Sequence, residues 1–170
     1  MQDIWNNLEV DVSALPAIEE VHFQKHPIRY RAYRYTLSTI WLGIPVLLIS
    51  ALALLLAEWW LWMLAGAFFF LFGFSLIAIS IGYHKRCYAL RQKDFSYREG
   101  WLFSSMTTVP FNRIQHTEVS QGPLERKYGL SRLHIYTAGG SSSDLSVPGL
   151  ESEEAAQLRD YVARKASQYA

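Results

Sequence analysis

The chain has 170 residues, a length typical of about one domain, and a net charge of +1, which excludes a strongly basic nucleic-acid binder and an acidic disordered chain. Its single cysteine, Cys87, excludes an internal disulfide framework and a multi-cysteine metal site. Charged residues make up 18% of the chain, below the usual value of about 25%, because residues 35–83 contain a single charged residue, Glu58. The composition is therefore an average over a membrane part and a soluble part.

Residues 1–34 form the first segment. Its first 20 residues are rich in acids and the apolar run starts late, which argues against a cleavable signal peptide. Residues 28–35 alternate tyrosine with arginine, a pattern that suits the headgroup level of a membrane. We therefore predict a cytoplasmic or interfacial segment that leads into the first membrane helix. The alternative is that this segment packs on the soluble domain.

Two long runs without charge follow, over residues 35–57 and 59–83. Each exceeds the about 20 helical residues that cross a bilayer core, and neither has the polar face of a soluble core helix. Glu58 and the tryptophans after it are typical of a turn at the membrane interface. The sequence predicts a transmembrane helical hairpin over residues 35–83, and Gly43 with Pro45 predicts a kink in its first helix.

The orientation of the hairpin follows from its flanking bases, because lysine and arginine favour the cytoplasmic side. Four bases precede the first span, four follow the second, and the turn has none. We therefore expect both termini in the cytoplasm, where Cys87 stays reduced. The flanking bases are Lys25, Arg29, Arg31 and Arg34 on one side and Lys85, Arg86, Arg91 and Lys93 on the other.

Small residues recur every seven positions in the second span, at Gly66, Gly73 and Ser80. Such a stripe lets helices approach closely. The favoured interpretation is packing against the first helix of the hairpin, and the alternative is dimerisation or contact with a partner's helices. Neither span contains Asp, Glu, Lys, Arg or His, so no transport pathway is indicated.

Residues 84–170 form the soluble domain, which reads as β-rich. Apolar residues alternate within its short segments, and turn signals separate the segments at spacings of roughly 8 to 12 residues. This pattern favours a barrel or sandwich. Gly100 supplies a hairpin turn, Pro110 indicates an edge strand, and residues 139–144 form a loop. The predicted strands are residues 86–91, 95–97, 101–103, 107–111, 114–120, 133–137 and 145–147.

The chain ends in a predicted helix. Ser152 can cap it, and Glu153 and Glu154 lie in its first turn, where they favour the helix dipole. One face has the spacing of a surface that covers a sheet. That face consists of Ala155, Leu158, Tyr161, Val162 and Lys165.

Four stretches in this domain resemble the bacterial pleckstrin-homology (PH) domain of the second type: TVPFNRIQH at 108–116, VSQGPLER at 119–126, YGL at 128–130 and YTAGG at 136–140. Two membrane helices followed by one such domain are similar to the YdbS-like membrane proteins. The resemblance implies an α+β fold in which a strongly bent antiparallel β-sheet barrel is capped by a C-terminal helix. It implies a bacterial cytoplasmic (inner) membrane protein with no agreed reaction, and a larger membrane protein bearing several such domains as partner.

Catalysis finds little support in the residues. The histidines form no metal-ligand spacing and no nucleophile motif is present. Ser141–Ser143 follow two glycines, but without the lysine of a phosphate-binding loop we interpret them as a solvated loop. We predict a non-enzymatic protein without cofactor or metal, and without nucleic acid as a partner.

Binding is the remaining class, in two forms. In the first, the domain is a protein-assembly module that uses its sheet edges, at Val109-Pro110 and Val147-Pro148, to bind a membrane-protein partner or its own copies. In the second, it binds anionic membrane lipids, whose headgroups would contact Lys85, Arg86, Arg91 and Lys93. The alternative for these four bases is that they only set the topology. We favour the assembly module.

Overall fold

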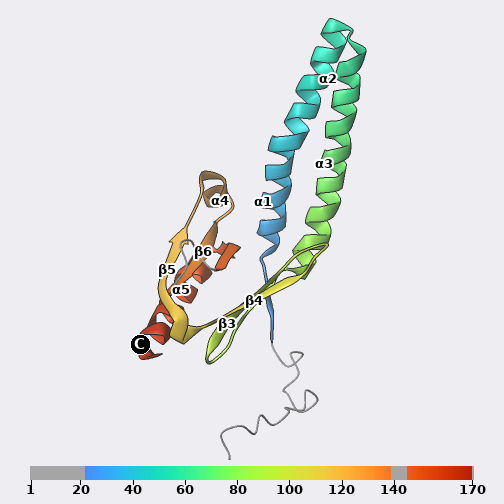
Figure 1. Ribbon diagram of the computed structural model, residues 1–170. Coiled ribbons are helices and arrows are strands. Elements are labelled where there is room, and N and C mark those ends of the chain that lie inside the picture. Colours follow the sequence, from blue (N-terminus) through green and yellow to red (C-terminus); the bar gives the residue numbers. More distant parts are fainter. Residues whose placement is uncertain (1–21, 139–144, 170) are drawn as a thin grey trace, which may run out of the picture.

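The computed structural model describes residues 22–138 and 145–169 (Figure 1). The predicted loop at 139–144 and the acid-rich start of the chain lie outside these residues. Two long helices stand side by side and rise from one end of a smaller domain of strands and short helices (Figure 1). The hairpin and the β-rich domain that the composition predicts are therefore both present.

The hairpin consists of α1 (Ile28–Ser38), a π-helical turn (Thr39–Gly43), α2 (Ile44–Leu56) and α3 (Trp59–Lys85). Where Gly43 and Pro45 predict a kink, the structure has this π turn, directly before Pro45, which has no N–H to donate to the preceding turn. The stretch Ile28–Leu56 has 29 residues and Trp59–Lys85 has 27, and both are long and apolar enough to cross a membrane. Only 6% of each apolar window is buried inside the structure, which is unlike a soluble core helix.

The two spans meet at a short turn, as Glu58 predicts. Ala57 ends α2 in the left-handed conformation, with φ of 54°, and its N–H donates to the carbonyl of Ala53 at 3.0 Å. Glu58 is extended and precedes the first residue of α3. Within the hairpin the buried contact positions are Ala53, Leu61, Ala65 and Ile79.

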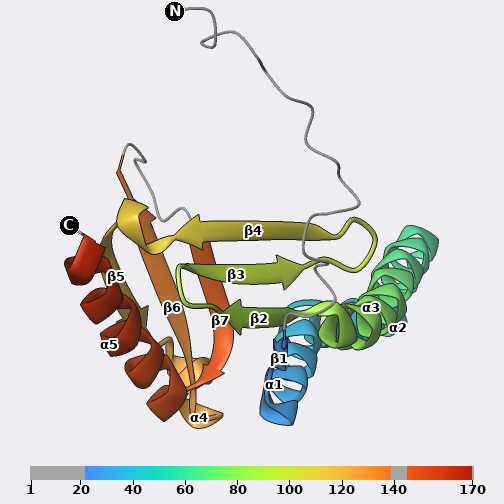
Figure 2. The same ribbon diagram turned by 90° about the horizontal axis from the view of Figure 1, so that it is seen from below.

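The strands form two antiparallel sheets. The first contains β1 (Gln24–Lys25), β2 (Cys87–Leu90), β3 (Asp94–Glu99) and β4 (Ser105–Pro110), in that order. The second contains β5 (Ile114–Ser120), β6 (Leu130–Thr137) and β7 (Leu145–Glu151), also in order. The two sheets cross one another, with α5 on the side away from the hairpin (Figure 2). The expected barrel does not close, because a 3-10 turn at Phe111–Arg113 separates β4 from β5 and the two strands do not pair.

Two predicted strand boundaries are wrong. Residues 101–103 do not continue the hairpin as a strand, because the register pairs Glu99 with Ser105 and leaves residues 100–104 as a loop. Gly100 begins this loop with φ of 121°. In the second sheet β6 begins at Leu130 and follows α4 (Pro123–Lys127), a short helix that the sequence analysis did not predict.

One core lies between the two sheets and the C-terminal helix, α5 (Ser152–Tyr169). The predicted apolar face of α5 is confirmed, since Ala155, Leu158 and Val162 are buried and Tyr161 packs against them. The other buried members of this core are Tyr88, Phe95, Tyr97, Val109, Phe111, Ile114, Leu133, Ile135, Leu145, Val147 and Leu150.

Candidate functional site

A second apolar cluster joins the hairpin to the sheet domain. Tyr30 and Tyr33 of α1 and Leu130 of β6 are its buried centre, and Tyr30 is only 1% exposed. Thr36 and Tyr128 share a hydrogen bond of 2.5 Å between their side-chain oxygens. We call this contact surface between α1, α3 and the sheet domain the junction. It fixes the start of the first membrane helix against the domain.

The segment before Tyr35 is predicted as an interfacial lead-in, with packing on the soluble domain as the alternative; in the structure it belongs to the junction from residue 24 onward. Strand β1 pairs with β2 through Gln24↔Tyr88 and Lys25↔Cys87. The hydroxyl of Tyr83, in α3, donates to the carbonyl of His26 at 2.9 Å. The described part of this segment therefore packs on the soluble domain, and the first helix begins at Ile28 rather than at residue 35. The helices of the hairpin thus extend beyond the predicted boundaries at residues 34 and 83, to Ile28 and to Lys85.

His26 is a buried polar residue of the junction. It is 2% exposed, and its Nδ1–H donates to the carbonyl of Gly149 at 3.3 Å. Its Nε2 has no hydrogen-bond partner among the described residues. Burial lowers the pKa of His26 from 6.5 to about 4, against the raising effect of the Gly149 carbonyl, and the nearby Arg86 guanidinium lowers it further. The ring is therefore neutral at ordinary pH.

Gly149 makes the close approach between β7 and α1 possible. Its φ is +78°, and a Cβ built there would lie no more than 2.5 Å from three ring atoms of Tyr30. Because only glycine accepts both the backbone conformation and the ring above it, this position is specific to the junction. The sequence analysis did not single it out.

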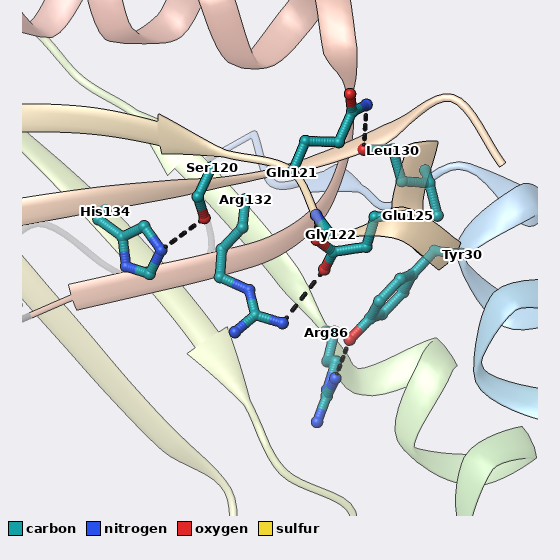
Figure 3. Close-up of polar contacts among 9 residues, drawn as sticks. All are labelled: Tyr30, Arg86, Ser120, Gln121, Gly122, Glu125, Leu130, Arg132 and His134. Carbon is teal, nitrogen blue, oxygen red and sulfur yellow. Dashed lines mark hydrogen bonds and ion pairs between the residues drawn. The ribbon is translucent and has the colours of Figure 1, made fainter. Parts of the chain in front are cut away.

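A polar network holds α4 beneath the junction, and Figure 3 shows its contacts. The carboxylate of Glu125 accepts the Gly122 N–H at 2.8 Å and pairs with Arg132 Nη2 at 3.1 Å. Gln121 donates to the carbonyl of Leu130 at 2.7 Å. The stretch 119–126, which resembles the bacterial PH domain, therefore has a structural role: it positions Leu130 against the tyrosines of α1.

A groove opens beside the junction, between α1, α3 and the loop 100–104. It has a volume of about 360 Å³. Arg34 and Arg86 lie in its lining together with Tyr30, and the rest of its lining is largely apolar. Arg86 Nη1 donates to the Tyr30 hydroxyl (Figure 3). We call this space the junction groove.

The loop 100–104 forms one wall of the groove and packs on α3. The Trp101 and Phe74 ring centroids are 5.4 Å apart, and Lys85 Nζ donates to the carbonyl of Trp101 at 3.0 Å. Leu102 and Phe103 project outward, with 66% and 85% of their surface exposed. This loop therefore extends the apolar surface of α3 at its domain end.

The four bases predicted to contact lipid headgroups are not gathered in one place. Only Arg86 lines the junction groove, and Lys85 lies at the end of α3. Arg91 pairs with Asp94 at 2.6 Å in the turn between β2 and β3, and Lys93 is exposed in the same turn. The β2–β3 hairpin carries this turn away from the helix ends, a separation that distance along the sequence does not reveal.

The small-residue stripe lies partly away from the hairpin contact. An added Cβ at Gly66 or Gly73 would meet no atom within 4 Å. These two glycines therefore do not pack against α2, and contact of Gly66, Gly73 and Ser80 with a second helix stays a prediction. The close hairpin contact is made elsewhere, for example by the hydroxyls of Ser38 and Ser75, which are 2.5 Å apart.

Groups suited to catalysis or metal binding are sparse. Among residues 22–138 and 145–169 no three His, Cys, Asp or Glu side chains gather as a metal site. His134 shares a hydrogen bond of 3.0 Å through Nε2 with Ser120 Oγ (Figure 3), and the His116 and Tyr136 rings lie 5.6 Å apart in a tilted arrangement. Burial raises the pKa of the Cys87 thiol, which disfavours its reactive thiolate form.

The missed residues of the junction had a signal in the sequence. Positions 30, 34, 37, 38 and 41 follow the 3-4 spacing of one helix face, but the predicted boundary at residue 34 assigns positions 30 and 34 to the interfacial segment and only the other three to the membrane helix. Extending the first helix back to Ile28 would have placed Tyr30 and Arg34 on that face. The partner residues on α3 and β7 depend on contacts distant in the sequence.

These features together define a membrane protein in which a helical hairpin is anchored on a PH-like domain. The chain belongs to the bacterial PH domain family, because the family profile matches residues 12–166. The family is not a known enzyme family.

One curated relative agrees with this assignment. The chain is 38% identical over 79 residues to the UPF0699 transmembrane protein YdbS of Bacillus subtilis (strain 168), a match that covers 46% of this chain and 48% of that protein. The match thus spans about half the length of that relative. A solved structure of a DUF1696 family protein with a pleckstrin-homology domain, from Shewanella loihica PV-4, matches with a TM-score of 0.37 and 15% identity. That match covers 48% of this chain and 72% of the other.

Proposed function

We propose that this protein is a non-enzymatic assembly module of the bacterial cytoplasmic membrane. Its PH-like domain would bind the same kind of domain in a larger membrane protein or in a second copy of the chain. The observation that carries the proposal is the open edge of the first sheet at β4. No cofactor is needed for this function.

Strand β4 pairs with β3 on one side only. Every second residue of such an edge directs its backbone N–H and C=O away from the sheet, where another strand can pair with them. Residues 105–108 are exposed, and Pro110 lies at the strand's end, where a missing N–H is tolerated. Strand addition at an open edge is a common mode of protein recognition.

The other edges are less open. In β7, Pro148 has no N–H to donate, and the strand is irregular at the neighbouring register shift. His26 and Tyr30 also cover Gly149 in this strand. Strand β1 has two residues, and β5 packs along α5. Among the described strands β4 is therefore the edge best placed to accept a partner.

The orientation within the membrane supports a cytoplasmic partner. Arg31, Arg34, Lys85 and Arg86 lie at the domain end of the hairpin, whereas the turn at Ala57 and Glu58 has no base. Because positive residues favour the cytoplasmic side, the domain and both termini are assigned to the cytoplasm. The junction ties the domain to the helices, so a partner at β4 would be held at a fixed place relative to the bilayer.

The test is photo-cross-linking in native membranes. A photoreactive amino acid replaces Thr107 in β4, and a matched control carries it at Gln157, an exposed residue of α5. The proposal expects adducts at position 107 with a bacterial PH domain of another protein or of a second copy, and none of these at 157. Absence of protein adducts at 107, or the same adducts at both positions, would refute it.

A further inference from the structure

The junction groove has the length of one membrane leaflet. Along α3 its lining runs from Ser75 to the end of the helix, directly before Arg86, which is about 15 Å of helix. Half of a bilayer core is about 15 Å thick. The groove begins at the domain end of the helices, so its long axis matches the depth that one lipid chain occupies.

The two helices supply facing stripes to this groove. On the first helix the stripe includes Arg34, Leu37 and Trp41. On α3 it includes Ala78 and Ile79, and Arg86 continues it directly after the last residue of that helix. The arginines lie at the domain end of each stripe, and the apolar residues lie further along the spans. The polarity of the groove therefore follows that of a lipid, with a charged end at the membrane surface and an apolar end in its interior.

The charged end lacks an acid. No carboxylate lines the groove, and neither Arg34 nor Arg86 forms an ion pair with the residues that the structure describes. Arg86 uses one N–H on the Tyr30 hydroxyl, and a guanidinium has five donors. Two half-buried guanidiniums that line the same groove favour an anion with several acceptor oxygens, and a phosphate is the commonest such group in a membrane.

We propose that the junction groove binds one anionic phospholipid of the surrounding membrane, with its phosphate on Arg34 and Arg86 and one acyl chain between α1 and α3. Trp101 closes the groove on the side of the loop 100–104, where its Cβ lies against Gly82. The volume of about 360 Å³ holds only part of a phospholipid, so the second chain stays in the bilayer. This site is separate from the β4 edge of the proposed function.

The test measures lipid retained by the full chain after reconstitution in phosphatidylcholine vesicles containing phosphatidylglycerol. Native mass spectrometry of the detergent-extracted protein counts the retained lipids. Arg34→Gln removes a proposed phosphate ligand that forms no ion pair with the described residues, and Ala78→Phe fills the groove without changing charge. We expect one phosphatidylglycerol per wild-type chain, and at least about tenfold lower occupancy in each variant.

Matched controls separate this site from general charge and bulk. Ala67→Phe makes the same substitution at an exposed position of α3 outside the groove. A double variant, Lys93→Gln with Arg113→Gln, removes two exposed bases elsewhere. Both controls should retain lipid as the wild type does, and all variants should keep the wild-type unfolding temperature.

Three results would overturn the proposal. The first is equal phosphatidylglycerol in wild type, Arg34→Gln and Ala78→Phe. The second is equal retention of phosphatidylcholine and phosphatidylglycerol by the wild type. The third is displacement of the lipid by an excess of inorganic phosphate alone, which would show that the arginines bind a free anion and that the apolar walls add nothing.

Discussion

Substituting Gly149 with alanine should loosen the junction by pressing a methyl group into the ring of Tyr30. The alanine is penalised twice. Its φ of +78° lies in the left-handed region, which costs about 1–2 kcal/mol for a residue with a Cβ. Overpacking against the ring, at no more than 2.5 Å from three of its atoms, adds about 1–3 kcal/mol. We expect a total loss of about 2–5 kcal/mol.

Gly129 is a matched control for the backbone part of this cost. It also has a positive φ, of +66°, but a Cβ there would come no closer than 3.8 Å to Nη1 of Arg29. Gly129→Ala should therefore cost only about 1–2 kcal/mol. Denaturant unfolding of the detergent-solubilised chain, followed by tryptophan fluorescence, measures both losses in free energy of unfolding.

A double-mutant cycle isolates the ring. In a Tyr30→Ala background the clash is absent, so Gly149→Ala should cost no more there than Gly129→Ala does in the wild type. Equal losses for the two glycine variants in the wild type, or an unchanged loss in the Tyr30→Ala background, would refute the reasoning that Tyr30 occupies the space above Gly149.

Three further predictions rest on separate residues. Burial lowers the pKa of His26 from 6.5 to about 4, so its ring is neutral in the folded chain while the unfolded chain binds a proton below pH 6.5. The free energy of unfolding should therefore be highest above pH 6.5 and fall by up to about 1.4 kcal/mol per pH unit between pH 6.5 and pH 4. His26→Asn should reduce this slope, and an unchanged slope would contradict the prediction. Ala57→Gly should raise the unfolding free energy by about 1 kcal/mol by relieving the φ of 54°, and an unchanged value would contradict this. Leu102 and Phe103 are exposed apolar side chains, so we expect the loop 100–104 to contact lipid. A fluorophore attached to the cysteine of Phe103→Cys, in a Cys87→Ser background, should be quenched more by brominated lipid than by aqueous iodide. The reverse order would place the loop outside the membrane.

The parts of the fold that could be predicted from sequence are those that one segment determines alone. A charge-free run long enough to cross a bilayer identifies each span without knowledge of its neighbours. The spacing of Ala155, Leu158 and Val162 likewise predicted the buried face of α5, and Pro110 and Pro148 indicated strands that are edges in the structure.

The junction could not be predicted in this way, because it depends on residues distant in the sequence. His26 and Gly149 are 123 positions apart. The need for glycine at position 149 becomes clear only from its contact with the ring of Tyr30. Likewise, Arg91 and Lys93 are near Arg86 in sequence, but the turn of the β2–β3 hairpin takes them away from it. Trp101 was interpreted as a strand residue because apolar runs are common to strands and to loops that pack on a helix.

The pairing of β1 with β2 has a consequence for how the molecule is made and how it moves. These neighbouring strands of one sheet precede and follow the hairpin, so the two membrane spans form an insertion within the PH-like domain rather than a tail attached to it. The first sheet can gain its β1 edge only after both spans have been synthesised. Once it has, both ends of the hairpin are tied to adjacent strands, so neither helix can rotate or slide in the bilayer without moving the sheet.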